Sequence, residues 1–323
     1  MTAIAAAFGN LGPIRRRVIY AYGAAIAIFL VGQVLHPGFA GGDSVRTILL
    51  VASFVGLVAA GQTLVILIGG IDLSVPWVLN GAAILLVTTG LGQNGRLPEA
   101  LALTLGMGLA VGFANGVGVA YVGVPAVVMT LGMNGIMQGL SLGLSQGLTC
   151  QACTSYAPPL LQHIELNTVL GIPEQVVLWI AVTIAVTVVL GATAFGRRTY
   201  AIGNNPTAAF LAGIRVKRVT VILYMLSGFF SALAGIMLVS YGGQASLGLG
   251  DPYLFQSIAA VVIGGASILG GRGTYLGSAA GAITLVALVT LLSAENIPEY
   301  GRSIVYGVTI LALLLLYGRD RRH

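Results

Sequence analysis

The residues most able to do chemistry lie in one short stretch, Gly-Gly-Ile-Asp-Leu-Ser-Val-Pro at 69–76. Asp72 is a carboxylate between two long apolar runs, where an ionisable group is costly and usually functional. Either Asp72 or Ser74 could cap the helix that follows, because both side chains can accept free N–H groups of a first turn. Pro76 suits that turn, where a missing donor costs little. The stretch predicts a helix cap or, together with Asn80, part of a translocation path.

A second segment has the features of a short helix that docks into a partner. Asn205 is a good N-cap, Pro206 suits the first helical position, and Gly213 suits the C-terminal stop. A helix of about two turns is marginal in water unless another surface holds it. It would present the small apolar residues Ala208, Ala209, Phe210 and Leu211. Docking into a cytoplasmic partner is the favoured interpretation, and a helix lying on the membrane face is the alternative.

The sequence argues against several kinds of enzyme. Lys217 is the only lysine and follows Val216, so the Gly-Lys-Ser/Thr of a phosphate-binding loop cannot occur. We therefore expect no ATP hydrolysis by this chain itself. The three histidines are scattered along the sequence and predict no metal site. We found neither paired carboxylates nor a Ser/His constellation within the apolar runs, which disfavours a membrane-embedded enzyme.

The two cysteines, Cys150 and Cys153, fall in a polar connection. They are too few for a disulfide framework, and their spacing lacks the βα context of a redox motif. A local disulfide in an oxidising compartment and two free thiols both remain open.

The composition is that of a membrane protein. Hydrophobic residues make up 57% of the chain, charged residues make up only 7%, and the mean hydropathy is +0.97. A soluble domain carries about 25% charged residues, so this chain could not cover a water-facing surface. The net charge of +6 does not indicate nucleic acid as a partner, because the arginines sit in short clusters between apolar runs. Lipid must surround most of the molecule.

Apolar runs separated by turn residues predict an all-α integral membrane protein with about ten transmembrane helices. The first run follows three arginines and lacks a small-x-small cleavage site, so we interpret it as an uncleaved span rather than a signal peptide. The expected spans are 18–35, 47–69, 75–91, 100–122, 124–144, 176–195, 219–241, 255–269, 274–292 and 302–317.

The basic residues support this topology. If the chain starts inside and alternates sides, twelve Lys and Arg residues fall in inner connections and three in outer ones. Such a bias predicts that the N and C termini are both cytoplasmic. The inner residues are Arg15, Arg16, Arg17, Arg197, Arg198, Arg215, Lys217, Arg218, Arg272, Arg319, Arg321 and Arg322, and the outer ones are Arg46, Arg96 and Arg302.

The spans form one transmembrane domain, 1–323, with two long connections. The outer connection, about 145–175, holds both cysteines, and the inner one, about 196–218, holds the short helix and five basic residues. Either could bind a soluble partner. Spans two to five and seven to ten are offset by five, so equivalent spans run in opposite directions, as in an inverted repeat. Span eight is short and span three contains Pro76, which points to a path between the halves.

Five motifs together resemble the permease subunits of ribose-type ABC sugar importers. In order they are Gly69-Gly70-Ile-Asp72-Leu-Ser-Val, Tyr200-Ala-Ile-Gly-Asn-Asn-Pro, Ala212-Gly-Ile, Ile258-Ala-Ala-Val-Val-Ile-Gly-Gly265 and Gly270-Gly-Arg-Gly-Thr274. They keep their order across about 45–317. Two stretches differ from the family pattern. Pro76 and Trp77 stand where members usually have Gly, and Tyr253-Leu-Phe-Gln-Ser257 replaces a Glu-Leu-Asp run.

The resemblance implies a multi-pass subunit of a bacterial inner-membrane importer. It implies a second permease subunit, identical or different, a cytoplasmic subunit that binds ATP and Mg, and an extracytoplasmic solute-binding protein. No cofactor is expected in this chain. The segment around Ala208 and Gly213 would be the coupling helix. We expect a monosaccharide or similar small polar solute. The alternatives are a furanone-like signalling sugar or a branched-chain amino acid and, from another class, a secondary transporter or channel.

Overall fold

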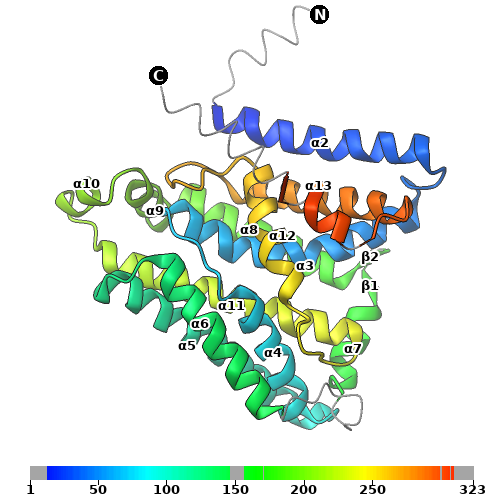
Figure 1. Cartoon of the computed structure of the whole chain (residues 1–323), viewed down its shortest axis with the longest axis horizontal. Helices are drawn as coiled ribbons and strands as arrows, with labels where there is room; N and C mark the ends of the chain where they lie inside the picture. Colours follow the sequence, from blue (N-terminus) through cyan, green and yellow to red (C-terminus); the bar gives the residue numbers. More distant parts are fainter. Residues whose placement is uncertain (1–12, 146–155, 170, 299, 306, 309–323) are drawn as a thin grey trace, which may run out of the picture.

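The computed structural model describes residues 13–145, 156–169, 171–298, 300–305 and 307–308. These residues form helices and one small hairpin, labelled here as in Figure 1. The elements are α2 (Pro13–Leu35), α3 (Gly42–Leu67), α4 (Val75–Gly90), the 3-10 helix η1 (Asn94–Arg96), α5 (Leu97–Val117), the π-helix η2 (Gly118–Val122), α6 (Ala126–Leu144), α7 (Pro159–Leu166), β1 (Thr168–Val169), β2 (Ile172–Pro173), α8 (Glu174–Ala192), α9 (Ala194–Asn204), α10 (Pro206–Leu211), α11 (Val216–Gly242), α12 (Asp251–Ile263) and α13 (Tyr275–Ala294).

The helices confirm an all-α membrane architecture. Within the described part of the chain, seven helices are long and apolar enough to cross a membrane, namely α2, α3, α5 with its flanking turns, α6, α8, α11 and α13. Two apolar helices are shorter, α4 with 16 residues and α12 with 13. At 1.5 Å per residue these measure about 24 Å and 20 Å, less than the hydrocarbon thickness of about 30 Å. The short eighth span was therefore predicted correctly, although α12 ends at Ile263 rather than near 269.

Some expectations fall outside the described residues. These include most of the tenth span, 302–317, together with Cys150, Cys153 and both ends of the chain. The outer connection contains α7 and the antiparallel pair β1–β2, which the sequence did not predict. The inner connection contains α9 and α10.

Helices α3 and α11 form the centre of the molecule. Most side chains of α3 are buried, and Gly61 lies so close to α11 that an added Cβ would approach the Ser227 Cα at 2.8 Å. Tyr275 of α13 donates a hydrogen bond to the Gly56 carbonyl of α3 (2.8 Å) and accepts one from Trp179 of α8 (3.0 Å). Close backbone approach and buried hydrogen bonds of this kind hold helices together where lipid provides no hydrophobic drive.

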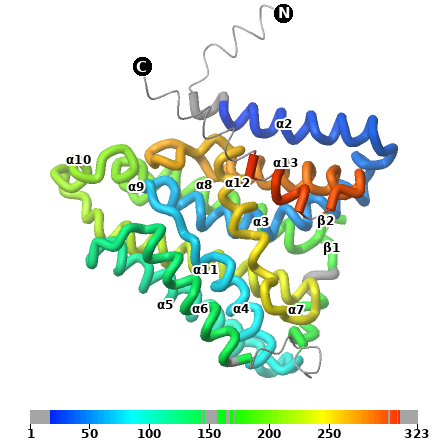
Figure 2. Tube along the Cα trace, in the orientation of Figure 1, coloured from blue at the N-terminus to red at the C-terminus, as the bar shows by residue number. Residues whose placement is uncertain are grey.

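The helices around this central pair form two similar sets. Helix α11 packs against α4 and α5, which also contact each other, and α3 packs against α12 and α13, which also contact each other. Helix α6 lies beside α4, and α2 covers α13 along the upper edge of Figures 1 and 2. The two short helices thus hold equivalent places, one in each set.

Glycines allow α5 and α11 to approach unusually closely. A Cβ added at Gly108 would lie 2.5 Å from the Gly228 carbonyl oxygen, and one at Gly112 would lie 2.7 Å from the Met225 Cα. Small residues at a helix interface let two backbones meet in this way. The backbones of these two helices are therefore in direct contact.

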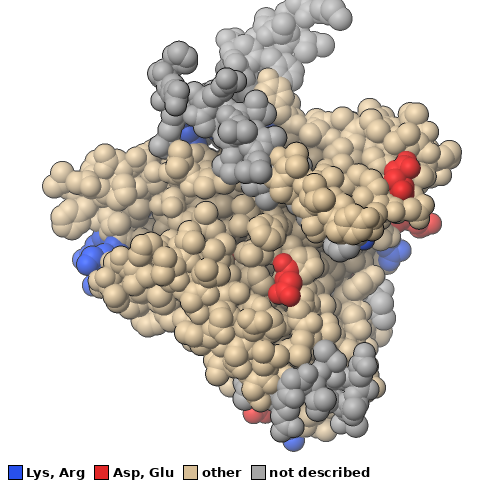
Figure 3. Space-filling model, viewed as in Figure 1, with Lys and Arg blue, Asp and Glu red and all other residues tan. Residues whose placement is uncertain are grey.

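Charged side chains are sparse on the face shown in Figure 3. Basic atoms lie at the left-hand edge, near α10 and the start of α11 in Figure 1, and also at the top, the right-hand edge and the bottom, and acidic atoms lie near the middle, at the right-hand edge and at the bottom. The broad uncharged area between them suits contact with lipid or with another apolar protein surface.

Candidate translocation and coupling site

The Asp72 carboxylate lies in the link between α3 and α4 and is only 1% exposed. Its Oδ1 accepts hydrogen bonds from the Ser74 N–H (3.0 Å) and the Ser74 hydroxyl (2.6 Å). Its Oδ2 accepts one from the Ser227 hydroxyl of α11 (2.7 Å). The Ser74 hydroxyl in turn accepts a hydrogen bond from the Asn115 amide of α5 (2.9 Å). This buried network ties the start of α4 to both α5 and α11.

The capping interpretation of this stretch is correct only in part. Ser74 occupies the N-cap position of α4, and Pro76 lies in the first turn. The Ser74 side chain makes no capping hydrogen bond, because its hydroxyl is used by Asp72 and Asn115. Of the two caps that the sequence allowed, Asp72 or Ser74, the Ser74 hydroxyl is therefore not the one that forms. Asp72 binds the Ser74 N–H just ahead of the first turn, so it fixes where α4 begins.

Asn80, also 1% exposed, holds a different segment. With its amide oriented to satisfy both groups, it donates to the Ser246 carbonyl (2.8 Å) and accepts from the Gly248 N–H (3.0 Å). Both partners belong to the link that leads from α11 into α12. Asn80 therefore connects α4 to the link that precedes α12, the other short helix.

The segment at 205–213 folds largely as its residues predict. The Asn205 side chain accepts a hydrogen bond from the Ala208 N–H (3.0 Å), Pro206 opens α10, and Gly213 adopts a φ of +82°. Phe210 and Leu211 are 68% and 79% exposed. Ala209 is buried against the main core, and Ala208 is exposed. Two large apolar side chains of α10 therefore have no cover within the described chain.

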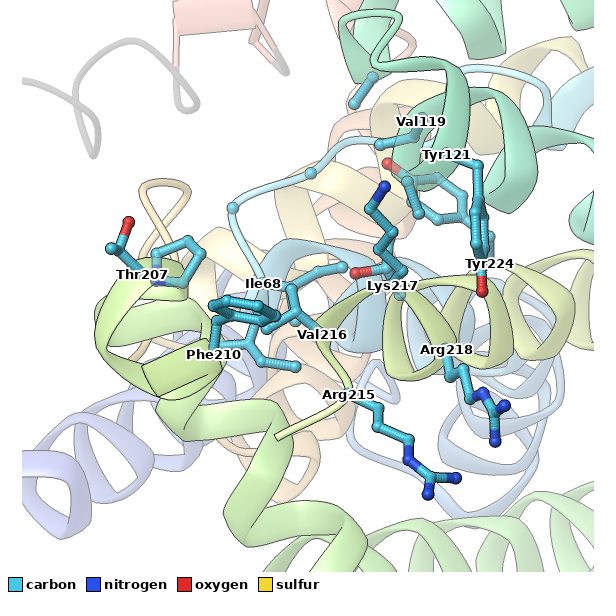
Figure 4. A pocket seen from close by; sticks show the side chains of 17 residues that line it. Ile68, Val119, Tyr121, Thr207, Phe210, Arg215, Val216, Lys217, Arg218 and Tyr224 are labelled. Atoms are coloured by element: carbon cyan, nitrogen blue, oxygen red, sulfur yellow. The ribbon is translucent and has the colours of Figure 1, made fainter. Parts of the chain in front are cut away.

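A cavity of about 750 Å³ lies between α10 and the neighbouring ends of η2 and α11 (Figure 4). Phe210 and Thr207 border it on the α10 side, and Lys217 points toward Tyr121 on the other. The Lys217 ammonium lies 5.2 Å from the centre of the Tyr121 ring, a cation–π distance. Arg215 and Arg218 lie together on the opposite side of the start of α11.

The structure brings only some of the predicted residues together. Pro206 and Phe210 line the cavity, whereas Asp72, Ser74, Pro76 and Asn80 do not. Tyr224 also lines the cavity, and its hydroxyl lies close to Gly70, another lining residue, where an added Cβ would approach it at 2.5 Å. Sequence reasoning missed Asn115, Ser227 and Tyr121. For Asn115 and Ser227 the available signal was a polar side chain inside an apolar span.

The described residues offer no obvious place for a metal. None of their His, Cys, Asp and Glu side chains form a group of three or more that could hold an ion.

Comparisons with known proteins agree with this architecture. The family described as "Branched-chain amino acid transport system / permease component" matches residues 44–314. The chain is 34% identical over 310 residues to the autoinducer 2 import system permease protein LsrC of Escherichia coli, covering 94% of this chain and 88% of the relative. It is 35% identical over 292 residues to the ribose import permease protein RbsC of Bacillus subtilis, covering 90% and 89%. No solved structure gave a significant match.

These similarities extend over nearly the whole of this chain and of its relatives, and the family match, residues 44–314, spans the positions of Asp72 and of the α9–α10 segment. The chain therefore belongs to the permease component family of branched-chain amino acid transport systems.

Proposed function

We propose that this chain is the transmembrane permease subunit of an ATP-driven ABC importer for a monosaccharide or similar small polar solute. The observation that carries the proposal is the similarity, over about nine tenths of the chain, to two import permeases. The apolar helices make it a multi-pass protein of the inner membrane. It supplies a pathway for the solute, and ATP hydrolysis takes place on another subunit.

The relatives favour a sugar-type solute. Their names specify ribose and autoinducer 2 import. They support this substrate class over a branched-chain amino acid, although the family name refers to one. They also favour an ABC importer over a secondary transporter or channel.

The complete assembly contains three further components. A second permease subunit, identical or different, completes the pathway. A cytoplasmic ATP-binding subunit holds ATP and Mg, and an extracytoplasmic solute-binding protein delivers the solute. The names of the relatives as import-system permeases support such partners.

The topology has ten spans with both termini in the cytoplasm, and spans two to five repeat as seven to ten in inverted orientation. The repeat is supported by the packing around the central helix pair. In such a repeat α3 corresponds to α11, α4 to α12 and α5 to α13. The contacts of α3 with α12 and α13 then correspond to those of α11 with α4 and α5, and both sets of contacts are present. The repeat also exchanges the two short helices, so the pathway runs between them.

Within this assembly, α10 is the coupling helix. Its capped ends fix its position, and its exposed Phe210 and Leu211 fit an apolar groove on the ATP-binding subunit. Asp72, Ser74 and Asn80 support the wall of the pathway, because their buried hydrogen bonds hold the start of α4 and the link to α12. Pro76 contributes by its place in the first turn of α4.

Reconstitution into liposomes tests the proposal. The chain purified alone should show no ATPase activity. With its ATP-binding subunit and binding protein, uptake should require ATP and should persist when proton and sodium gradients are collapsed. Uptake by this chain alone, driven by an ion gradient, would show that it is a secondary transporter instead.

A further inference from the structure

Two of the motifs that carry the family resemblance meet the end of α3 at one junction. The C-terminal end of α9 contributes Gly203, the end of α3 contributes Leu67, and the link between α12 and α13 contributes Gly271. The segment after α3 leads into α4, and the segment that holds Gly271 follows α12. The junction is therefore connected along the chain to both short helices, to the start of α4 and to the end of α12.

The backbones at the junction leave no room for a side chain. A Cβ added at Gly203 would meet the Leu67 carbonyl oxygen and would lie 2.5 Å from the Gly271 nitrogen. Gly271 itself donates a hydrogen bond to that Leu67 oxygen (2.9 Å) and has a φ of +75°. Only glycine combines such close approach with this backbone conformation.

Tyr200 adds a second tie between α9 and the same link. Its hydroxyl donates a hydrogen bond to the Gly273 carbonyl (2.9 Å). A tyrosine hydroxyl is protonated at neutral pH, and burial raises the pKa of Tyr200 further above its ordinary value. The hydroxyl therefore remains a donor.

Helices α9 and α10 are joined by a single residue and pack against each other. Asn205 is the only residue between them, and it ends one helix and caps the next. Ile202 and Ala209 are both buried in the main core. A displacement of α10 must therefore move the end of α9 as well.

We propose that α9 is a clamp that passes the movement of α10 to both short helices at once, with Gly203 and Tyr200 as its positioning residues. This inference rests on the proposed coupling role of α10. Gly203 transmits the displacement to the end of α3, and so to α4. Gly203 and Tyr200 together transmit it to the link that follows α12.

A matching junction on the other side of the short helices supports the clamp. There the segment before α7 ties the end of α4 to the end of α11, from which a link leads into α12. The Gly92 N–H, just after α4, donates to the Tyr156 carbonyl (3.0 Å), and the Ala157 N–H donates to the Gly243 carbonyl, ahead of α12 (3.0 Å). Of these two junctions, the α9 junction is the one that continues into the exposed helix α10.

Single cysteines on the two short helices test the clamp. Cys150 and Cys153 are first replaced by serine, and Thr88→Cys on α4 or Phe255→Cys on α12 is labelled with a maleimide in the complete complex. Both positions are exposed. Trapping with ATP and vanadate should change the labelling rate at both sites. Gly203→Ala should reduce both changes about threefold or more, and Tyr200→Phe should reduce mainly the change at Phe255→Cys.

Matched controls separate transmission from folding. Gly191→Ala on α8, where an added Cβ meets nothing within 4 Å, and Tyr20→Phe at an exposed position should leave both changes intact. The variants should still bind the ATP-binding subunit and hydrolyse ATP. If Gly203→Ala does not accumulate in the membrane, Tyr200→Phe decides the question.

Two outcomes have distinct meanings. Unaltered labelling changes in an assembled Gly203→Ala complex, or in Tyr200→Phe where only that variant assembles, overturn the clamp and leave the proposed function intact. No ATP-dependent change at either site in the unsubstituted complex overturns the proposed function itself.

Discussion

At the scale of single residues, Asp72 has the clearest role, because it accepts three buried hydrogen bonds. Two come from Ser74 at the start of α4 and one comes from Ser227 of α11. We expect Asp72→Leu to lower the stability of the purified protein by about 3 kcal/mol or more, since it leaves buried donors of Ser74 and Ser227 without an acceptor. Asp72→Asn should retain most of this stability, because its amide oxygen can still accept from Ser74. Thermal unfolding in detergent measures both effects.

The same pair of variants separates structure from charge. Glu99→Leu removes an exposed carboxylate at the start of α5 and serves as the control, with an expected change within about 0.5 kcal/mol. If Asp72→Asn is as stable as the unsubstituted protein yet fails to transport, the negative charge itself is needed. Equal stability of Asp72→Leu and the unsubstituted protein would contradict the buried network.

The sequence singled out Asp72 as a candidate site residue, but it could not predict the hydrogen-bond partners of this side chain. An acid in an apolar region is visible locally, since its cost there requires compensation. Ser227 lies 155 positions away along the chain, and its hydroxyl becomes an Asp72 donor only once α11 packs beside the link. For the same reason, the missing cap at Ser74 could not be foreseen, because Asn115 reaches it from another helix.

At the scale of elements, α10 offers a direct test of coupling. Replacing Phe210 and Leu211 together with serine should abolish co-purification with the ATP-binding subunit and abolish uptake. Loss of two buried apolar side chains from a docked interface corresponds to about 2 kcal/mol or more. Membrane insertion should be normal, because no spanning helix changes. Pull-down and uptake assays on membranes with matched expression measure the effect.

A small change on the same helix is the control for that experiment. Thr207→Ser alters an exposed position of α10 that is not among the proposed docking residues, so binding should persist. Normal binding and uptake by the Phe210/Leu211 double variant would mean that α10 is not the coupling element, and the neighbouring Arg215–Arg218 segment would be the next candidate.

The tight α5–α11 interface makes a second prediction at this scale. Gly112→Ala should destabilise the protein by about 1–3 kcal/mol, because its methyl group would meet the backbone at Tyr224 and Met225. Gly106→Ala on the same helix should cause no loss, since an added Cβ there meets nothing within 4 Å. Comparing the two melting temperatures tests the packing, and equal values would contradict it.

The sequence located the spanning elements better than it located their ends. Apolar run length predicted the helices, and the Asn205–Pro206 signal correctly predicted where α10 begins. The π-helix η2 at the end of α5 and the small helix α7 were not predicted, because neither changes the apolar pattern. Their conformations depend on neighbours. Met129, for example, lies against Gly118 at the start of η2.

At the scale of the whole molecule, composition alone predicted a membrane protein, because so few charged residues cannot cover a soluble surface. The length of the apolar runs predicted that its spans are α-helices. The arrangement of the spans was less accessible. The offset of five between equivalent spans suggested paired halves, but the sequence did not predict that α3 and α11 meet at the centre. That contact depends on glycine and serine positions whose partners lie in the other half.

Sidedness is the remaining whole-molecule prediction, and it follows from the split of twelve inner and three outer basic residues. In a background with Cys150 and Cys153 replaced by serine, Gly95→Cys should react with an impermeant maleimide added to intact cells. Arg215→Cys should react only after the membrane is permeabilised. Both positions are exposed, so a failure to react with the maleimide would not be due to burial within the protein. A reporter fused after Arg322, outside the described residues, should read cytoplasmic. External labelling of Arg215→Cys would overturn the ten-span topology and, with it, the cytoplasmic position of α10.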